Sequence, residues 1–148
     1  MFLSGGIESK GIDAYSLAMK WLLDNKLPRD GLIVAIGGGV VGDLSAFVAS
    51  TYMRGIGLIL VPTTTTSMID SAIGGKTGIN FQDQVNAIGT YYNPLAVFMD
   101  IRFLLTLNDR DYFSGICEAI KMSITSDVSQ AKKLLQQSAP FTLSLIHI

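Results

Sequence analysis

A run of glycines in the first third of the chain has the spacing of a dinucleotide-binding turn. Gly37-Gly38-Gly39-Val40-Val41-Gly42 fits the pattern G-x-G-x-x-G directly after an apolar segment. Glycines let the backbone approach a pyrophosphate, and the free N–H groups of a following helix face its charge. The acidic residue that usually holds the ribose about 20 residues later is absent. The pattern therefore predicts phosphate binding but disfavours an ordinary Rossmann dehydrogenase, and a tight turn without a ligand is the alternative.

A second glycine-rich segment, residues 70–77, nearly matches the phosphate-loop pattern G-x-x-x-x-G-K-[ST]. Asp70 stands where that pattern has its first glycine, and its carboxylate would face the phosphates. Lys76 can still bind an anion as a flexible point charge. A solvated surface lysine in a turn is the alternative interpretation.

Two further groups of polar residues could contact a ligand. Pro62 precedes four threonines at the end of an apolar segment, where ligands of open α/β sheets collect, although such hydroxyls also cap helices. Glu118 and Lys121 are three residues apart and share a helix face. They are either a surface ion pair or a metal-binding carboxylate beside a phosphate-binding ammonium. His147, the sole histidine, lies near the end of the chain and is a poor ligand candidate.

The apolar pattern predicts the elements that position these residues. A first helix is expected to have Asp13 as N-cap and to stop at Pro28, and a second to have Asp43 as cap and to end near Gly55. Their apolar faces are predicted to hold Tyr15, Ala18, Met19, Leu22 and Leu23 in the first helix, and Leu44, Phe47, Val48 and Thr51 in the second. Buried strands are expected over residues 32–36, 58–61 and 96–99. The first two strands and the helix between them predict a parallel βαβ unit with a right-handed crossover.

The stretch over residues 62–94 is far longer than the usual connection of about 2 to 6 residues, which indicates a functional loop. From Asn108 onward helix signals replace strand signals, with Ile116, Ile120 and Ile124 at helical spacing and a further segment over residues 129–137. The sequence thus predicts an α/β domain with a Rossmann-like parallel sheet over residues 1–107, lacking its N-terminal part, and the start of an all-α domain over residues 108–148. Because residues 141–148 complete no element, we expect the natural reading frame to stop or change there.

Composition excludes several classes of protein. The chain of 148 residues is 49% hydrophobic and 16% charged, which is typical of a globular domain. Its net charge is −1, so it has no excess of positive charge that would attract nucleic acid or an anionic membrane. A single cysteine, Cys117, allows neither an intrachain disulfide nor a cysteine cluster for a metal, so a reducing cytoplasm is expected. No segment has the length of a membrane span or the pattern of a signal peptide.

Several motifs together resemble the 3-dehydroquinate synthase family of sugar phosphate cyclases in order and spacing, from about residue 5 to about residue 126. They are Gly37-Gly38-Gly39-Val40-Val41-Gly42-Asp43, Thr51-Tyr52-Met53-Arg54-Gly55, Val61-Pro62-Thr63-Thr64, Asp70 with Gly74-Gly75-Lys76-Thr77-Gly78, Asn86 with Ile88-Gly89, and Gly115 with Glu118 and Lys121. The resemblance implies an NAD-binding α/β domain followed by a helical domain that brings a divalent metal, zinc or cobalt. It also implies a cytoplasmic enzyme that is a homodimer at full length.

The resemblance also implies roles for particular residues. Contacts to NAD would come from Gly38, Gly39, Val40, Asp43, Thr63, Thr64 and Thr106, and contacts to the sugar phosphate from Arg54, Asp70, Lys76, Asn86 and Lys121. Glu118 would be one of three metal ligands, and the family's other two are histidines further along the chain. In the family's reaction a ring hydroxyl is oxidised by NAD, phosphate is eliminated, the ketone is reduced again and the opened ring closes by an aldol step.

Three departures from the family pattern bear on this expectation. Val85 stands where the family usually has a lysine before the asparagine, so one contact to NAD is lost or replaced. The family's Glu-x-x-Lys is shortened to Glu8-Ser9-Lys10, so only Lys10 corresponds well. The two histidine ligands are absent from these 148 residues, so we expect a truncated chain that neither holds the metal tightly nor turns over.

The leading hypothesis is therefore a 3-dehydroquinate synthase of the shikimate route to aromatic amino acids, a carbon–oxygen lyase acting on a phosphate. Another sugar phosphate cyclase, making 2-deoxy-scyllo-inosose or a valiolone, would share every motif quoted. A metal-dependent alcohol or glycerol phosphate dehydrogenase, a P-loop NTPase and a non-catalytic NAD-binding module are the alternatives from other classes.

Overall fold

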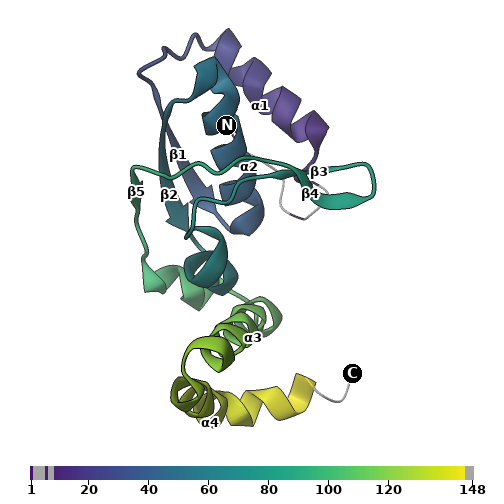
Figure 1. The fold of residues 1–148 in the computed structure, drawn as a ribbon, viewed down its shortest axis with the longest axis vertical. Helices are drawn as coiled ribbons and strands as arrows, with labels where there is room; N and C mark the ends of the chain where they lie inside the picture. The colour runs from purple at the N-terminus through teal and green to yellow at the C-terminus, as the bar shows by residue number, and fades with distance from the viewer. Residues whose placement is uncertain (2–5, 7–8, 146–148) are drawn as a thin grey trace.

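A computed structural model describes residues 1, 6 and 9–145 of the chain, with side chains as far as residue 136. Its centre is a parallel sheet in the order β1-β2-β5, made of β1 Leu32–Gly37, β2 Gly57–Pro62 and β5 Ala96–Val97 (Figure 1). β1 and β2 pair along their whole length, from Leu32 beside Gly57 to Gly37 beside Pro62. The parallel βαβ unit is thus confirmed, whereas the third strand is shorter than predicted.

Two helices cover one face of this sheet. α2 Gly39–Thr51 packs on β1 and β2, and α1 Ile12–Asp24 packs on α2 (Figure 1). The core between them contains side chains that are at most 8% exposed, among them Ala18, Leu22, Leu44, Phe47, Val48, Leu58 and Leu60. The predicted apolar faces are largely confirmed, but Leu23 is 55% exposed.

Both predicted N-caps are wrong. α1 has Gly11 as its N-cap and α2 has Gly38, and neither uses a side chain to cap its first N–H groups. Asp13 lies in the first turn of α1 and Asp43 is the fifth residue of α2. Each helix therefore begins earlier than the first carboxylate, so Asp43 is available for other contacts.

The second face of the sheet is exposed along β1 in the part of the chain that the structure describes. Leu32, Val34 and Ile36 are 45%, 52% and 60% exposed, so the prediction of a fully buried strand is wrong for this side of β1. They alternate with Ile33 and Ala35, which face α2, because successive strand residues point to opposite faces. Parallel sheets normally bury both faces, and here the second face is left open at β1, whereas β2 is partly covered on that side.

This apolar face predicts how the 148-residue chain behaves when it is expressed alone. We expect it to self-associate, because an exposed edge strand with an apolar face promotes association. Val34→Lys should move the elution towards that of a 15.9 kDa monomer in size-exclusion chromatography with light scattering. Val85→Lys is the matched control, since Val85 is 63% exposed but lies away from this face, on β4. Equal association of both variants would contradict the assignment.

The long connection between β2 and β5 is partly structured. A π-helical turn, η3 Ser67–Ser71, is followed by a hairpin of β3 Ile79–Phe81 and β4 Gln84–Ile88 (Figure 1). The N–H of Gly78 donates to the Asp43 carbonyl at 3.4 Å, which brings the start of the hairpin to the first turns of α2. The predicted functional loop therefore folds back over the glycine run.

The predicted change to helices is confirmed. A 3-10 helix, η4 Ile101–Thr106, leads into α3 Asp109–Ser126 and α4 Val128–Leu145, which pack together at the opposite end of the molecule from α1 (Figure 1). Asn108 caps α3 by accepting the Asp111 N–H at 2.9 Å. The isoleucine face of α3 is buried only in part, because Ile124 is 57% exposed. Among the helices described, none is long and apolar enough to cross a membrane.

Candidate active site

The glycine run lies at the carboxyl ends of β1 and β2. Gly38 has an extended backbone and Gly39 is the first residue of α2, so the unpaired N–H groups of that helix begin here. The space is tight: a Cβ on Gly38 would lie 3.0 Å from Thr64 Cγ2, and one on Gly39 would lie 3.0 Å from Ser71 Oγ. A small pocket at this point is lined by Gly37, Gly38, Gly42, Pro62, Ser67 and Ser71, among others. This is the geometry in which a helix start binds a phosphate group.

The threonine tract joins this turn through backbone and hydroxyl bonds. The Thr63 N–H donates to the Gly37 carbonyl at 2.9 Å. Thr64 and Ser67 cap each other: the Thr64 N–H donates to Ser67 Oγ at 3.0 Å and the Ser67 N–H donates to Thr64 Oγ1 at 3.2 Å. The capping role that the sequence left open is therefore present for Thr64, and it holds η3 beside the glycine turn.

Helix α3 crosses the same tract at Gly115. A Cβ on Gly115 would lie 2.4 Å from Thr65 Cβ and 2.5 Å from the Thr66 nitrogen, so only glycine permits this approach of the two backbones. Thr65 is 4% exposed, and its hydroxyl has no hydrogen-bond partner within the described residues. Gly115 thus brings the face of α3 that carries Glu118 and Lys121 next to η3, which carries Asp70.

Glu118 and Lys121 form the ion pair that their spacing predicted, with side chains 24% and 70% exposed. The hydrogen bond to Glu118 raises the pKa of Lys121, and the negative charges of Glu118 and Asp70 add to this effect. Asp70 therefore lies within electrostatic range of α3.

A second polar group sits on the hairpin side of α2. Lys10, which is only 6% exposed, donates from Nζ to Asp43 Oδ2 and to Asn86 Oδ1, both at 2.5 Å. The Asn86 N–H donates to Asn80 Oδ1 at 3.0 Å, and the Asn80 N–H donates to the Lys10 carbonyl at 2.7 Å. Two residues with separately predicted roles, Asp43 and Asn86, are thus joined by one buried lysine. In the sequence, the shortened family motif that ends at Lys10 was the only signal that Lys10 belongs to the site.

Burial raises the pKa of Asp43 above its usual value, while the hydrogen bond and charge of Lys10 oppose the shift and the negative charge of Asp70 adds to it. The negative charge of Asp70 thus contributes to the raised pKa of both Asp43 on α2 and Lys121 on α3. η3, which carries Asp70, contacts both α2 and α3, so Asp70 is on the element that neighbours both polar groups. The result is a series of charged and amide side chains, Asn86, Lys10, Asp43, Asp70, Lys121 and Glu118, which we call the polar series.

The structure does not join all predicted site residues to the polar series. Within the described residues, no hydrogen bond or ion pair links it to Arg54, Lys76 or Thr106. Arg54 ends the short 3-10 helix η2 Tyr52–Arg54 with a φ of 70°, and Lys76 forms an isolated bridge with Tyr91. The Thr106 hydroxyl donates to the Phe103 carbonyl at 2.7 Å. Their contacts to ligands, like that of the half-buried Val40 in α2, remain predictions.

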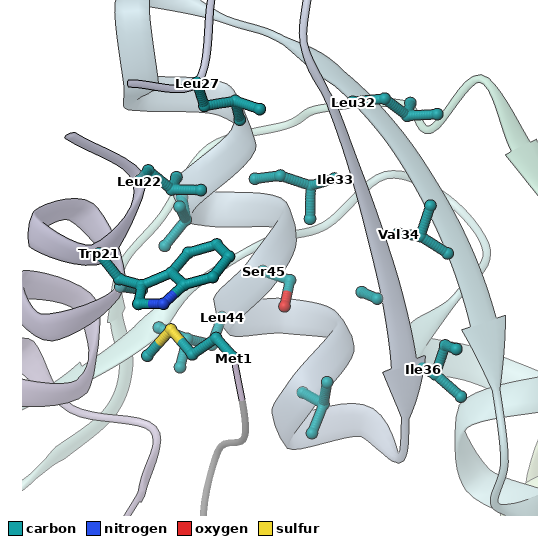
Figure 2. A pocket seen from close by; sticks show the side chains of 14 residues that line it. Met1, Trp21, Leu22, Leu27, Leu32, Ile33, Val34, Ile36, Leu44 and Ser45 are labelled. Carbon is teal, nitrogen blue, oxygen red and sulfur yellow. The ribbon is translucent and has the colours of Figure 1, made fainter. Parts of the chain in front are cut away.

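A larger pocket of about 510 Å³ lies elsewhere, between α1, α2 and the edge of β1 (Figure 2). Trp21, Leu22, Ile33 and Leu44 gather around it, and Ser45 supplies a hydroxyl. Among the described residues that line it none is charged, so they offer nothing to a pyrophosphate or a sugar phosphate. We assign the site to the glycine turn and the polar series instead.

The described residues do not by themselves form a metal site. No group of three or more His, Cys, Asp or Glu side chains among them could hold an ion. Glu118 is the single predicted ligand, and the neighbouring Cys117 is exposed. His147, and Glu8 of the shortened family motif, lie outside the described residues, as do residues 146–148 of the predicted irregular tail. The prediction that this tail completes no element is wrong for residues 141–145, because they continue α4 to its end at Leu145.

A parallel sheet with a glycine turn at its carboxyl end, followed by helices, defines an α/β protein with a Rossmann-like fold. The chain belongs to the 3-dehydroquinate synthase family: residues 1–114 match the family model described as 3-dehydroquinate synthase N-terminal. The resemblance noted from the motifs is thereby confirmed.

Curated relatives include proteins named 3-dehydroquinate synthase and a multifunctional polypeptide. The chain is 51% identical over 125 residues to the 3-dehydroquinate synthase of Alkaliphilus oremlandii (strain OhILAs), covering 84% of this chain and 34% of the relative. It is 42% identical over 137 residues to the pentafunctional AROM polypeptide of Malassezia globosa, covering 93% of this chain and 8% of that one. The chain thus spans about a third of the length of the single-function relative.

Solved structures agree on the fold. A 2-deoxy-scyllo-inosose synthase complexed with carbaglucose-6-phosphate, NAD+ and Co2+ matches with a TM-score of 0.75 and 35% identity, over 80% of this chain and 32% of that one. The 2-epi-5-epi-valiolone synthase ValA of Streptomyces hygroscopicus, with NAD+ and Zn2+ bound, matches with a TM-score of 0.74 and 28% identity. The match covers 94% of this chain and 42% of that one. A glycerol dehydrogenase of Schizosaccharomyces pombe, at 23% identity and a TM-score of 0.62, shows the fold alone.

Proposed function

We propose that the protein carrying these residues is a 3-dehydroquinate synthase, which converts 3-deoxy-D-arabino-heptulosonate 7-phosphate to 3-dehydroquinate with elimination of phosphate. The observation that carries the proposal is the polar series, in which residues with predicted substrate and cofactor roles come from the neighbouring elements α2, η3, β4 and α3. Membership of the family and 51% identity to a relative of that name support it.

The glycine turn would bind the NAD pyrophosphate. Gly38, Gly39 and Val40 offer the N–H groups at the start of α2, and Asp43, Thr63, Thr64 and Thr106 would contact the rest of the dinucleotide. Bound NAD supplies a hydride acceptor that the reaction regenerates. The residues of this chain orient that cofactor, and the tight contacts of Gly38 and Gly39 leave the turn no room for side chains.

The substrate would lie between η3, the hairpin and α3. Arg54, Lys76 and Lys121 supply cations for the phosphate and carboxylate, Asn86 an amide donor, and Asp70 an acceptor that orients ring hydroxyls. Lys121 suits this role because its side chain is 70% exposed on the face of α3 that approaches η3.

A divalent metal, zinc or cobalt, belongs to the proposal through the two cyclase structures that hold one. Glu118 would supply one ligand, and the others would come from outside the described residues, so no step is derived through the ion. The domain division near Leu107, a homodimer and a cytoplasmic location complete the proposal.

A different cyclase substrate is the second candidate. It is favoured by the inosose and valiolone synthases among the structural matches and by Val85, which replaces the family lysine beside Asn86 and is 63% exposed. The 3-dehydroquinate synthase proposal rests instead on the family model and on the names of the curated relatives.

The test is phosphate release by the natural protein, with any sequence that flanks these 148 residues. We expect release from the heptulosonate 7-phosphate, with NAD required but no net NADH formed. Release only from glucose 6-phosphate or sedoheptulose 7-phosphate would assign another cyclase. Accumulation of NADH in proportion to product would instead indicate a dehydrogenase.

A further inference from the structure

We propose that Lys10 is a positioning residue that couples the cofactor side of the site to its substrate side, by holding Asp43 and Asn86 with one ammonium group. This inference rests on the proposed function, since Asp43 is there assigned to NAD and Asn86 to the substrate. It adds a role for a side chain that neither assignment contains.

The geometry of Lys10 is that of a buried connector. Its two partners are 33 and 76 residues away in sequence, on the first turns of α2 and on β4, and both bonds are 2.5 Å long. The residue is 6% exposed, so it is buried among its protein partners. Its own carbonyl accepts the Asn80 N–H, which fixes its backbone to the same hairpin that carries Asn86.

The chemistry of an ammonium group dictates how Asn86 is presented. Lysine only donates, so Asn86 must turn its Oδ1 to Lys10 and leave its Nδ2 group to donate to a ligand oxygen. The backbone of Asn86 has a φ of 55° and its N–H is held by Asn80 Oδ1, so the residue is fixed on both sides. Lys10 thus selects one of the two amide orientations.

The same ammonium acts on Asp43 through charge. Burial and Asp70 raise the pKa of Asp43, and Lys10 is the group that opposes them. Lys10, Asp70 and the uncharged Asn86 are the side chains that bear on this carboxylate from the packed elements. Removing Lys10 should therefore let Asp43 take up a proton at higher pH and weaken its contact to NAD.

The test is a pair of double-mutant cycles in the natural protein, with any sequence that flanks these 148 residues. We expect Lys10→Met to lower kcat/KM by roughly tenfold or more in the otherwise unchanged enzyme, but by less than about threefold when Asn86 is already Ala. NAD affinity is measured by calorimetry without turnover. Lys10→Met should lower this affinity far less in an Asp43→Asn background than in the otherwise unchanged protein. The acid limb of NAD binding should also move to higher pH in Lys10→Met.

Lys20→Met is the matched control, because Lys20 pairs with Asp24 on the exposed surface of α1. It should leave both readouts within about twofold. If Lys10→Met does not fold, Lys10→Gln, which keeps a donor but no charge, enters the same cycles. The inference is overturned if Lys10→Met lowers kcat/KM and NAD affinity equally with and without the partner residue, as a purely structural role predicts. It is also overturned if the Lys10 variants match the unchanged protein in both measurements. If the unchanged protein releases phosphate but the variants show no coupling, this inference alone is wrong. If the unchanged protein neither releases phosphate nor binds NAD, the proposed function is wrong as well.

Discussion

Gly115→Ala is expected to lower kcat/KM by about a hundredfold, because it moves α3 away from the threonine tract. The added Cβ would lie 2.4 to 2.6 Å from Thr65 Cβ, the Thr65 carbonyl carbon and the Thr66 nitrogen. Two of these atoms are backbone, so no side-chain rotation relieves the clash. A displacement of about 1 Å at a site can cost on the order of 10²-fold in rate. Overpacking of this kind also costs about 1 to 3 kcal/mol of stability.

The measurement is steady-state kinetics of the natural protein, together with its thermal unfolding. Ser114→Ala, at the neighbouring exposed position of the same helix, is the control for a change in α3. Gly42→Ala controls for the glycine replacement in the unfolding experiment, since a Cβ there meets no atom within 4 Å. Activity of Gly115→Ala equal to that of Ser114→Ala would show that the position of α3 does not govern the site.

Gly39→Val is expected to raise the Kd for NAD by about a hundredfold or more, which corresponds to roughly 2.7 kcal/mol. Gly39 is the first residue of α2, where N–H groups face a bound pyrophosphate, and a Cβ alone would already lie 3.0 Å from Ser71 Oγ. Its φ lies outside the left-handed region, so valine adds volume rather than backbone strain. The two branched methyl groups would occupy the place of the phosphate.

Calorimetric titration with NAD measures this prediction. Ser45→Ala on the same helix is the control, because Ser45 lines the apolar pocket of Figure 2 rather than the turn. NAD binding by Gly39→Val at the affinity of the unchanged protein would mean that the run is a tight turn without a ligand. That was the alternative interpretation of the sequence.

Local patterns determined the order and type of most elements. The glycine run, the two long apolar strands and the helices after Asn108 all lie where they were predicted, because turn chemistry and periodicity act over a few residues. The motif series also identified the family, since its members stand in a fixed order along the chain. The N-caps were wrong because glycine backbone, without a side chain, begins each helix earlier than the nearest aspartate.

What depended on distant residues was decided only by the tertiary structure. The exposure of Leu32, Val34 and Ile36 depends on which elements cover the sheet, and a strand's own composition does not state this. The linkage of Asp43 to Asn86 through Lys10 spans 76 residues, and no local spacing records it. Likewise, the need for glycine at position 115 arises from the Thr65 backbone that passes beneath it. Sequence by itself therefore determined which groups are available for chemistry, while their convergence follows from packing between segments far apart in the chain.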